Sequence, residues 1–98
     1  MNIKQKRENK KVIVYISGRL DTNTSPKFLD YLKEAMVGAE ELILDLKDVD
    51  YISSAGLRVI LLAQKTMSAQ GSMSVANVCE DVMEVFELTG FTDILTII

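Results

Sequence analysis

The sequence predicts a single α/β domain, with a mostly parallel sheet of about five strands and three or four helices. Short apolar, β-branched runs alternate along the chain with stretches whose apolar residues recur at helical spacing, which is typical of strand–helix–strand units. Right-handed crossovers through such units produce parallel neighbouring strands. A length of 98 residues with 48% hydrophobic residues suits one domain, residues 1–98, with one modest core.

The chain opens on a predicted hairpin. Residues 2–8 are polar apart from one large apolar side chain, which is typical of an edge strand kept from aggregating by its lysines. A turn follows at Asn9, which tolerates a positive φ. The Val-Ile-Val-Tyr-Ile run within residues 11–17 then predicts a strand buried on both faces. Residues 18–24 form a polar loop before the first helix.

Helices and strands alternate through the rest of the chain. Ser25 can cap the first helix, and Pro26 suits its first position. We expect strands at Glu41–Leu46, Met73–Val78 and Ile94–Ile98, and helices from Ser25 to a stop at Gly38, from about Ala55 to Gln70, and from Glu80 or Asp81 to Gly90. The second helix is apolar on nearly all sides, which predicts by default that it is deeply buried. The alternative is that one of its faces contacts a partner. In the third helix, the side chains expected to point inward are Val82, Val85, Phe86 and Leu88.

The most informative stretch, residues 48–57, joins a very apolar strand to the second helix. Ser53 and Ser54 fall where that helix begins, and the two small residues after them leave the amides of its first turn open. A hydroxyl at this place can be a helix cap, a nucleophile or a phosphate acceptor. Asp21 also follows a strand and precedes a helix, so we expect Asp21 and Ser54 at the same edge of the sheet.

Composition and charge exclude several classes of function. With a formal net charge of -3 and basic residues clustered only near the N-terminus, the chain lacks the broad basic face of a nucleic-acid binder. It has no histidine and no Gly-rich phosphate loop, so we expect neither an enzyme nor a bound metal or cofactor. The carboxylates that could still gather around magnesium are Asp21, Asp45, Asp48 and Asp50, for which turns and caps are the preferred interpretation.

The cysteine content and the hydropathy predict a cytoplasmic protein. A single cysteine, Cys79, allows no internal disulfide, as expected in a reducing compartment. No apolar run is long enough to span a membrane, and the polar start is not a signal peptide. We therefore expect no contact with a membrane. As a separate expectation, the protein is a monomer or a weak dimer.

The central stretch reads Asp48-Val49-Asp50-Tyr51-Ile52-Ser53-Ser54-Ala55-Gly56-Leu57-Arg58-Val59-Ile60-Leu61. It resembles the signature of the STAS domain, specifically that of the bacterial anti-sigma factor antagonists. Two further motifs are similar to those of the same family, Gly18-Arg19-Leu20-Asp21 after the second strand and Val85-Phe86-Glu87-Leu88-Thr89-Gly90-Phe91 at the last helix and its stop. The resemblance covers nearly the whole chain in the right order, and it implies a STAS-like fold.

The resemblance implies a switch between proteins and not an enzyme. In this family the unmodified antagonist binds an anti-sigma factor, which then releases its sigma factor. The anti-sigma factor is also a serine kinase that phosphorylates the antagonist, and a PP2C-type phosphatase reverses the modification.

The serine that is modified in this family lies two positions before the signature glycine, so the resemblance implies phosphorylation at Ser54. Ser53 stands where the family often has aspartate, and Ala55 where it often has a second serine or threonine, so Ser53 is a rival acceptor. The implied partner-binding residues are Asp21, Thr22, Ser53, Ser54, Gly56, Leu57 and Arg58. The alternative is a STAS scaffold or ligand-sensing module in which Ser54 only caps a helix.

Overall fold

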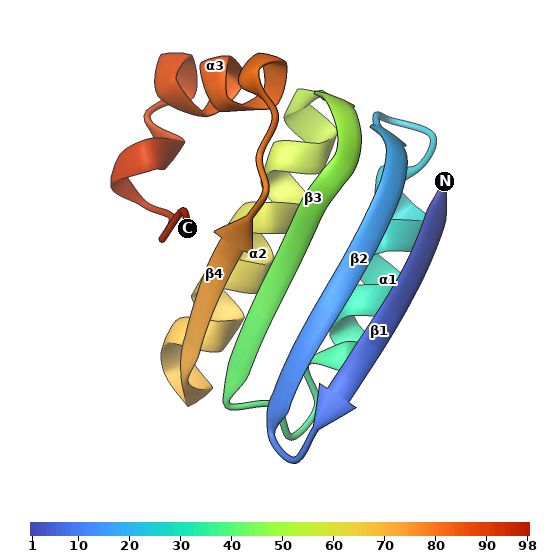
Figure 1. Ribbon diagram of the computed structural model, residues 1–98, viewed down its shortest axis with the longest axis vertical. Helices are drawn as coiled ribbons and strands as arrows, with labels where there is room; N and C mark the ends of the chain where they lie inside the picture. Colours follow the sequence, from blue (N-terminus) through green and yellow to red (C-terminus); the bar gives the residue numbers. More distant parts are fainter.

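The computed structural model describes residues 1–98 as a four-stranded sheet with helices packed on one of its faces (Figure 1). Along the chain the elements are β1 (Asn2–Glu8), β2 (Lys11–Leu20), α1 (Ser25–Ala35), β3 (Glu41–Ile52), α2 (Ser54–Gln70), β4 (Ser72–Ala76), α3 (Glu80–Thr89) and a 3-10 helix (Phe91–Asp93). The strands lie in the order β1-β2-β3-β4, with β1 antiparallel to β2 and the other pairs parallel. The predicted α/β fold with a mostly parallel sheet is confirmed. None of the helices is long and apolar enough to cross a membrane.

Helices α1 and α2 lie on the same face of the sheet, and α3 lies beyond the carboxyl ends of the parallel strands (Figure 1). Both crossovers, from β2 to β3 and from β3 to β4, step in the same direction across the sheet. Right-handed crossovers that step in one direction place their helices on one side, so the opposite face stays open. Val12 and Val14 of β2 are therefore fully buried, whereas Tyr15, the next residue of the same strand, is 41% exposed. The prediction that this strand is buried on both faces is wrong.

Strands β2 and β3 continue beyond their predicted ends. Their ladder extends to the pair Leu20 and Ile52, through segments that the sequence analysis assigns to loops. Two register shifts, between Tyr15 and Ser17 and between Gly18 and Arg19, let the ladder continue. These extensions carry buried apolar side chains, of which Leu20 and Ile52 pack into the core, and they bring both strand ends to the same place.

The prediction of a last strand at Ile94–Ile98 is wrong. After α3 the chain forms the 3-10 helix, and the N–H groups of Ile94 and Leu95 still donate to the Phe91 carbonyl, at 3.0 and 2.8 Å. Only the final residues reach β4, where they form a single parallel bridge between Val75 and Ile97. The sheet therefore has four strands instead of about five.

The ends of α3 and α1 agree only in part with the predicted helix signals. Helix α3 has the predicted bounds, and Gly90 ends it with a left-handed φ of 80°. Its Leu88 is 80% exposed, so the expectation that this side chain points inward is wrong. In α1 the N-cap residue is Thr24, and Ser25, predicted as the cap, is the buried first residue of the helix.

Candidate functional site

The carboxyl ends of β2 and β3 meet the amino end of α2 at one edge of the sheet. The Ser53 N–H donates to the Leu20 carbonyl at 2.8 Å, which ties the start of α2 to the end of β2. Asp21 follows Leu20 directly, so Asp21 and Ser54 lie at the same edge, as predicted. The predicted partner-binding residues all come from the two segments that adjoin here, residues 21–22 and 53–58.

The two serines at this edge differ in exposure. Helix α2 begins one residue earlier than predicted, with Ser53 as its N-cap residue and Ser54 as its first helical residue. The Ser53 side chain makes no cap hydrogen bond, and its Oγ is buried without a hydrogen-bond partner in the protein. Ser54 is exposed. The cap role considered for Ser54 is therefore wrong, and Ser54 is the serine that a second protein can reach.

Gly56 and Leu57 hold the start of α2 against the sheet. A Cβ atom at Gly56 would lie 2.9 Å from the Leu20 Cβ, 2.9 Å from the Ile52 Cγ1 and 3.0 Å from the Leu20 carbonyl oxygen. Carbon atoms pack at about 3.5 to 4.0 Å, so any side chain here would push the helix away. Leu57 is buried in the core. These two residues of the predicted surface position Ser54 and offer no side chain to a partner.

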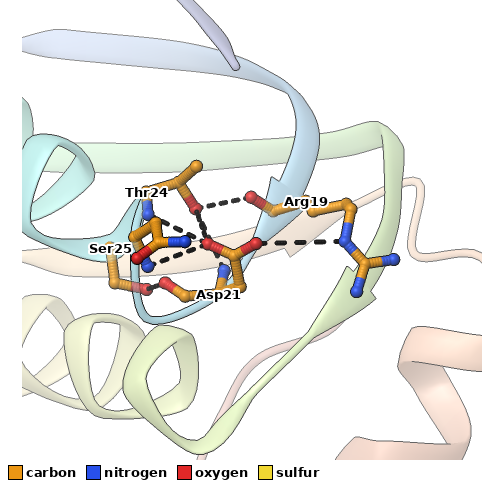
Figure 2. A network of polar contacts seen from close by, with 5 residues as sticks. Arg19, Asp21, Thr24 and Ser25 are labelled. Atoms are coloured by element: carbon orange, nitrogen blue, oxygen red, sulfur yellow. Dashed lines mark hydrogen bonds and ion pairs between the residues drawn. The ribbon is translucent and has the colours of Figure 1, made fainter.

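Asp21 organises the loop between β2 and α1 (Figure 2). Its Oδ1 accepts hydrogen bonds from the N–H groups of Asn23 and Thr24, both at 3.0 Å. The Thr24 hydroxyl accepts from the Asp21 N–H at 3.0 Å and donates to the Arg19 carbonyl at 2.6 Å. The Ser25 hydroxyl donates to the Asp21 carbonyl at 2.5 Å. Both the carboxylate and the backbone of Asp21 thus fix the loop, which gives Thr22 its position beside α2.

We expect Asp21→Asn to lower the melting temperature by an amount that shrinks in acid. The Thr24 N–H, which donates to the carboxylate, makes the largest contribution to holding the pKa of Asp21 below its ordinary value. A carboxyl with a lowered folded-state pKa stabilises the fold above its unfolded-state pKa of about 3.9, and this contribution is lost as the pH falls through the folded-state pKa. Thermal melts at a series of pH values from neutral to acid measure the difference.

Asp30→Asn, an exposed change on α1, is the matched control for the loss of one negative charge. A melting-temperature difference for Asp21→Asn that stays constant from neutral to acid pH would contradict the capping role of the carboxylate.

Two exposed arginines at this edge have different surroundings. The Arg19 guanidinium lies 4.0 Å from the centroid of the Tyr51 ring, and its Nε is 3.9 Å from Asp21 Oδ2. Arg58 takes part in none of the three ion pairs of the structure. Residues four apart are neighbours on a helix surface, so Arg58 lies beside Ser54 on α2. Arg58 is thus the free cation next to the exposed serine.

An open groove of about 320 Å³ adjoins this edge, between α1 and α2. Thr22 and Arg58, both in the predicted surface, contribute to its lining. Sequence reasoning missed its apolar residues, among them Leu29 on α1 and Leu62 on α2. The one signal that pointed to them was the apolar excess of α2, since Leu62 is 43% exposed and belongs to the face left over after the core is packed.

Asp45 and Cys79, two of the remaining candidate groups, make contacts within the fold. No set of three or more metal-ligating side chains gathers anywhere in the structure. Asp45 accepts hydrogen bonds from the Lys47 N–H and the Asn77 side chain, both at 3.0 Å. The half-buried Cys79 donates from its Sγ to the Val49 carbonyl at 3.3 Å, which fits a packing role.

The fold and the geometry of this edge define a STAS domain. The family model described as STAS domain matches residues 1–98, and the chain belongs to this family. Within it, the anti-sigma-B factor antagonist of Bacillus subtilis is 31% identical over 98 residues, which cover 99% of this chain and 90% of that protein. BtrV of Bordetella bronchiseptica, provisionally named an anti-sigma factor antagonist, is 44% identical over 61 residues, which cover 61% of this chain and 53%, about half, of that protein.

Solved structures agree on the fold. The anti-sigma factor antagonist SpoIIAA in its unphosphorylated form superposes with a TM-score of 0.84 at 16% identity, over 99% of this chain and 88% of that one. Its phosphorylated form, from Bacillus, superposes with a TM-score of 0.76 at 15% identity, over 99% of this chain and 91% of that one.

Proposed function

We propose that this protein is an anti-sigma factor antagonist whose unphosphorylated form binds an anti-sigma factor with serine kinase activity and thereby releases the sigma factor. That kinase phosphorylates Ser54, which abolishes binding, and a PP2C-type phosphatase restores it. The observation that carries the proposal is the exposed Ser54 at the first position of α2, two residues before Gly56. The likeness of the whole chain to named antagonists supports it.

The position of Ser54 suits a modification that blocks a partner and spares the fold. A phosphate adds about −1.5 to −2 charge at neutral pH. The free amides and the dipole of a helix start favour negative charge, and Ser54 is exposed, so the domain can accept the phosphate without losing a buried contact. A partner seated over Ser54 would have to bury the same charge, which weakens its binding.

The alternative function, a scaffold or ligand-sensing module in which Ser54 only caps α2, has less support. The N-cap position belongs to Ser53, so the helix does not need the Ser54 hydroxyl as its cap. In the proposed function the protein acts in the cytoplasm as a monomer or weak dimer, and it has no catalytic activity of its own.

We expect the protein isolated from its own cells to carry phosphate on Ser54, as detected by tandem mass spectrometry. The purified anti-sigma factor kinase and ATP should add one phosphate to the wild type and none to Ser54→Ala. Ser53→Ala is the matched control and should still be phosphorylated, because the Ser53 Oγ is buried. Phosphate on Ser53, or equal labelling of Ser54→Ala, would contradict the assignment of the site.

A further inference from the structure

The groove between α1 and α2 is a surface that the chain itself leaves unfilled. Its walls are Leu29 of α1 and Val59 and Leu62 of α2, with small or polar residues between them. It begins at Ala55, the residue after Ser54, and it reaches along α2 to Leu62, two turns further on. With a volume of about 320 Å³ it has room for a large apolar side chain from outside. The groove is therefore continuous with the Ser54 surface.

The charge of the groove constrains its occupant. Arg58 is the one charged residue in its lining, and no carboxylate lines it. Arg58 is exposed and takes part in none of the ion pairs of the structure. A complementary occupant thus combines an apolar side chain, which covers Leu62, with a neighbouring carboxylate, which pairs with Arg58.

We propose that this groove is the anchoring pocket for the anti-sigma factor, and that it receives an apolar side chain of that protein next to a carboxylate that pairs with Arg58. The inference rests on the proposed function, and it adds to it the place and the chemistry of the contact. A few buried residues, most often aromatic side chains and arginine, contribute most of the binding energy of an interface, and they lie in well-packed pockets surrounded by contacts that exclude water.

The same pocket explains how a phosphate on Ser54 weakens the binding of the partner. Ser54 and Arg58 are four residues apart on α2, so their side chains can meet on the helix surface. A phosphate on Ser54 pairs with Arg58 and takes it from the partner's carboxylate, which the phosphate also repels. Arg58 is thus the residue for which phosphate and partner compete.

The test is calorimetric titration of the purified anti-sigma factor kinase of the same organism with unphosphorylated wild type, Leu62→Gln and Arg58→Gln. We expect each variant to bind at least about tenfold more weakly, as is usual for anchor residues. Leu88→Gln, at another exposed helical leucine, and Lys65→Gln, at another exposed cation of α2, are the matched controls and should bind as the wild type does. Thermal melts verify that each variant is folded, and Leu62→Ala provides a second variant, which truncates the apolar side chain at the same position.

The outcomes separate this inference from the proposed function. If the wild type bound the kinase, and Leu62→Gln and Leu62→Ala bound it as tightly as the wild type, the pocket would be overturned and the proposed function would stand. If added salt weakened the binding of the wild type no more than it weakened the binding of Arg58→Gln, the proposed ion pair would be overturned. Wild type that does not bind the kinase at all would overturn the proposed function and this inference with it.

Discussion

Replacing Ser54 with aspartate is expected to weaken binding of the anti-sigma factor about a hundredfold, because an unpaired or repelled charge at an interface costs several kcal/mol. The aspartate would lie at the first position of α2, beside the Arg58 that the partner is proposed to use. The fold should be kept, with a change in stability within about 1 kcal/mol, since negative charge is favourable in the first turn of a helix. Calorimetric titration with the kinase and thermal melts measure the two effects.

Ser54→Asn is the matched control for Ser54→Asp, because it has the same shape without the charge. It should bind within a few-fold of wild type. If Ser54→Asp bound as tightly as wild type while the phosphorylated protein did not, a single negative charge would not be the switch. If phosphorylation shifted the backbone amide signals throughout the sheet in NMR spectra, the switch would act by refolding and not by local charge.

Ser54→Ala separates the phosphate acceptor from the helix cap. A serine that capped α2 would cost about 0.5–2 kcal/mol of stability when replaced by alanine. Because the N-cap residue is Ser53 and Ser54 is exposed, we expect Ser54→Ala to change stability by less than about 0.5 kcal/mol, the usual range for surface substitutions. Its binding to the kinase should survive.

Gly56→Ala is expected to destabilise the domain by about 1–3 kcal/mol, the usual cost of overpacking. Helix propensity alone predicts the opposite sign, since alanine is favoured over glycine inside a helix by about 1 kcal/mol. The steric clash should outweigh the gain in helix propensity, because the added Cβ would lie 3.0 Å or less from both the side chain and the carbonyl of Leu20. This is the point where a hydrogen bond ties α2 to β2. Thermal and denaturant unfolding measure the change, with a fall in melting temperature of at least about 4 °C for a domain of this size.

Ser68→Ala tests a smaller gain in helix propensity, of at most about 0.7 kcal/mol, at an exposed position of α2 where no neighbouring strand is in the way. The hydrogen bonds that it removes are exposed ones to Gln64, one turn earlier in the same helix. The change should leave stability unchanged or slightly raised. A Gly56→Ala protein as stable as the wild type would show that the start of α2 can move off the end of β2 at little cost.

Features set by neighbouring residues could be read from the sequence. The bounds of α3 follow from the acidic residues at its start and from Gly90, which adopts the left-handed conformation that ends a helix. The alternation of apolar strands and amphipathic helices predicts a parallel sheet, and strand ends then place Asp21 and Ser54 at one edge. Each of these inferences needs only local periodicity, caps and one rule of handedness.

Features set by distant residues needed the tertiary structure. Tyr15 lies in a run as apolar as any buried strand, yet it is 41% exposed, because both crossovers step the same way and cover one face only. The extension of β3 to Ile52 depends on a partner strand that supplies hydrogen bonds to a polar stretch. Ile94–Ile98 is as apolar as a strand, but the N–H groups of Ile94 and Leu95 still donate to the Phe91 carbonyl in the turn after Gly90, and only a single bridge, between Val75 and Ile97, forms with β4.

The features of the candidate site are likewise set partly by neighbouring residues and partly by distant ones. The sequence alone places two serines at a helix start, because a helix must begin where the apolar periodicity does. Only the packing of α2 against the end of β2 decides that the Ser53 Oγ is buried and Ser54 exposed. The groove beside them joins Leu29 to Leu62, residues far apart along the chain, and it exists because two crossovers bring α1 and α2 side by side on one face of the sheet.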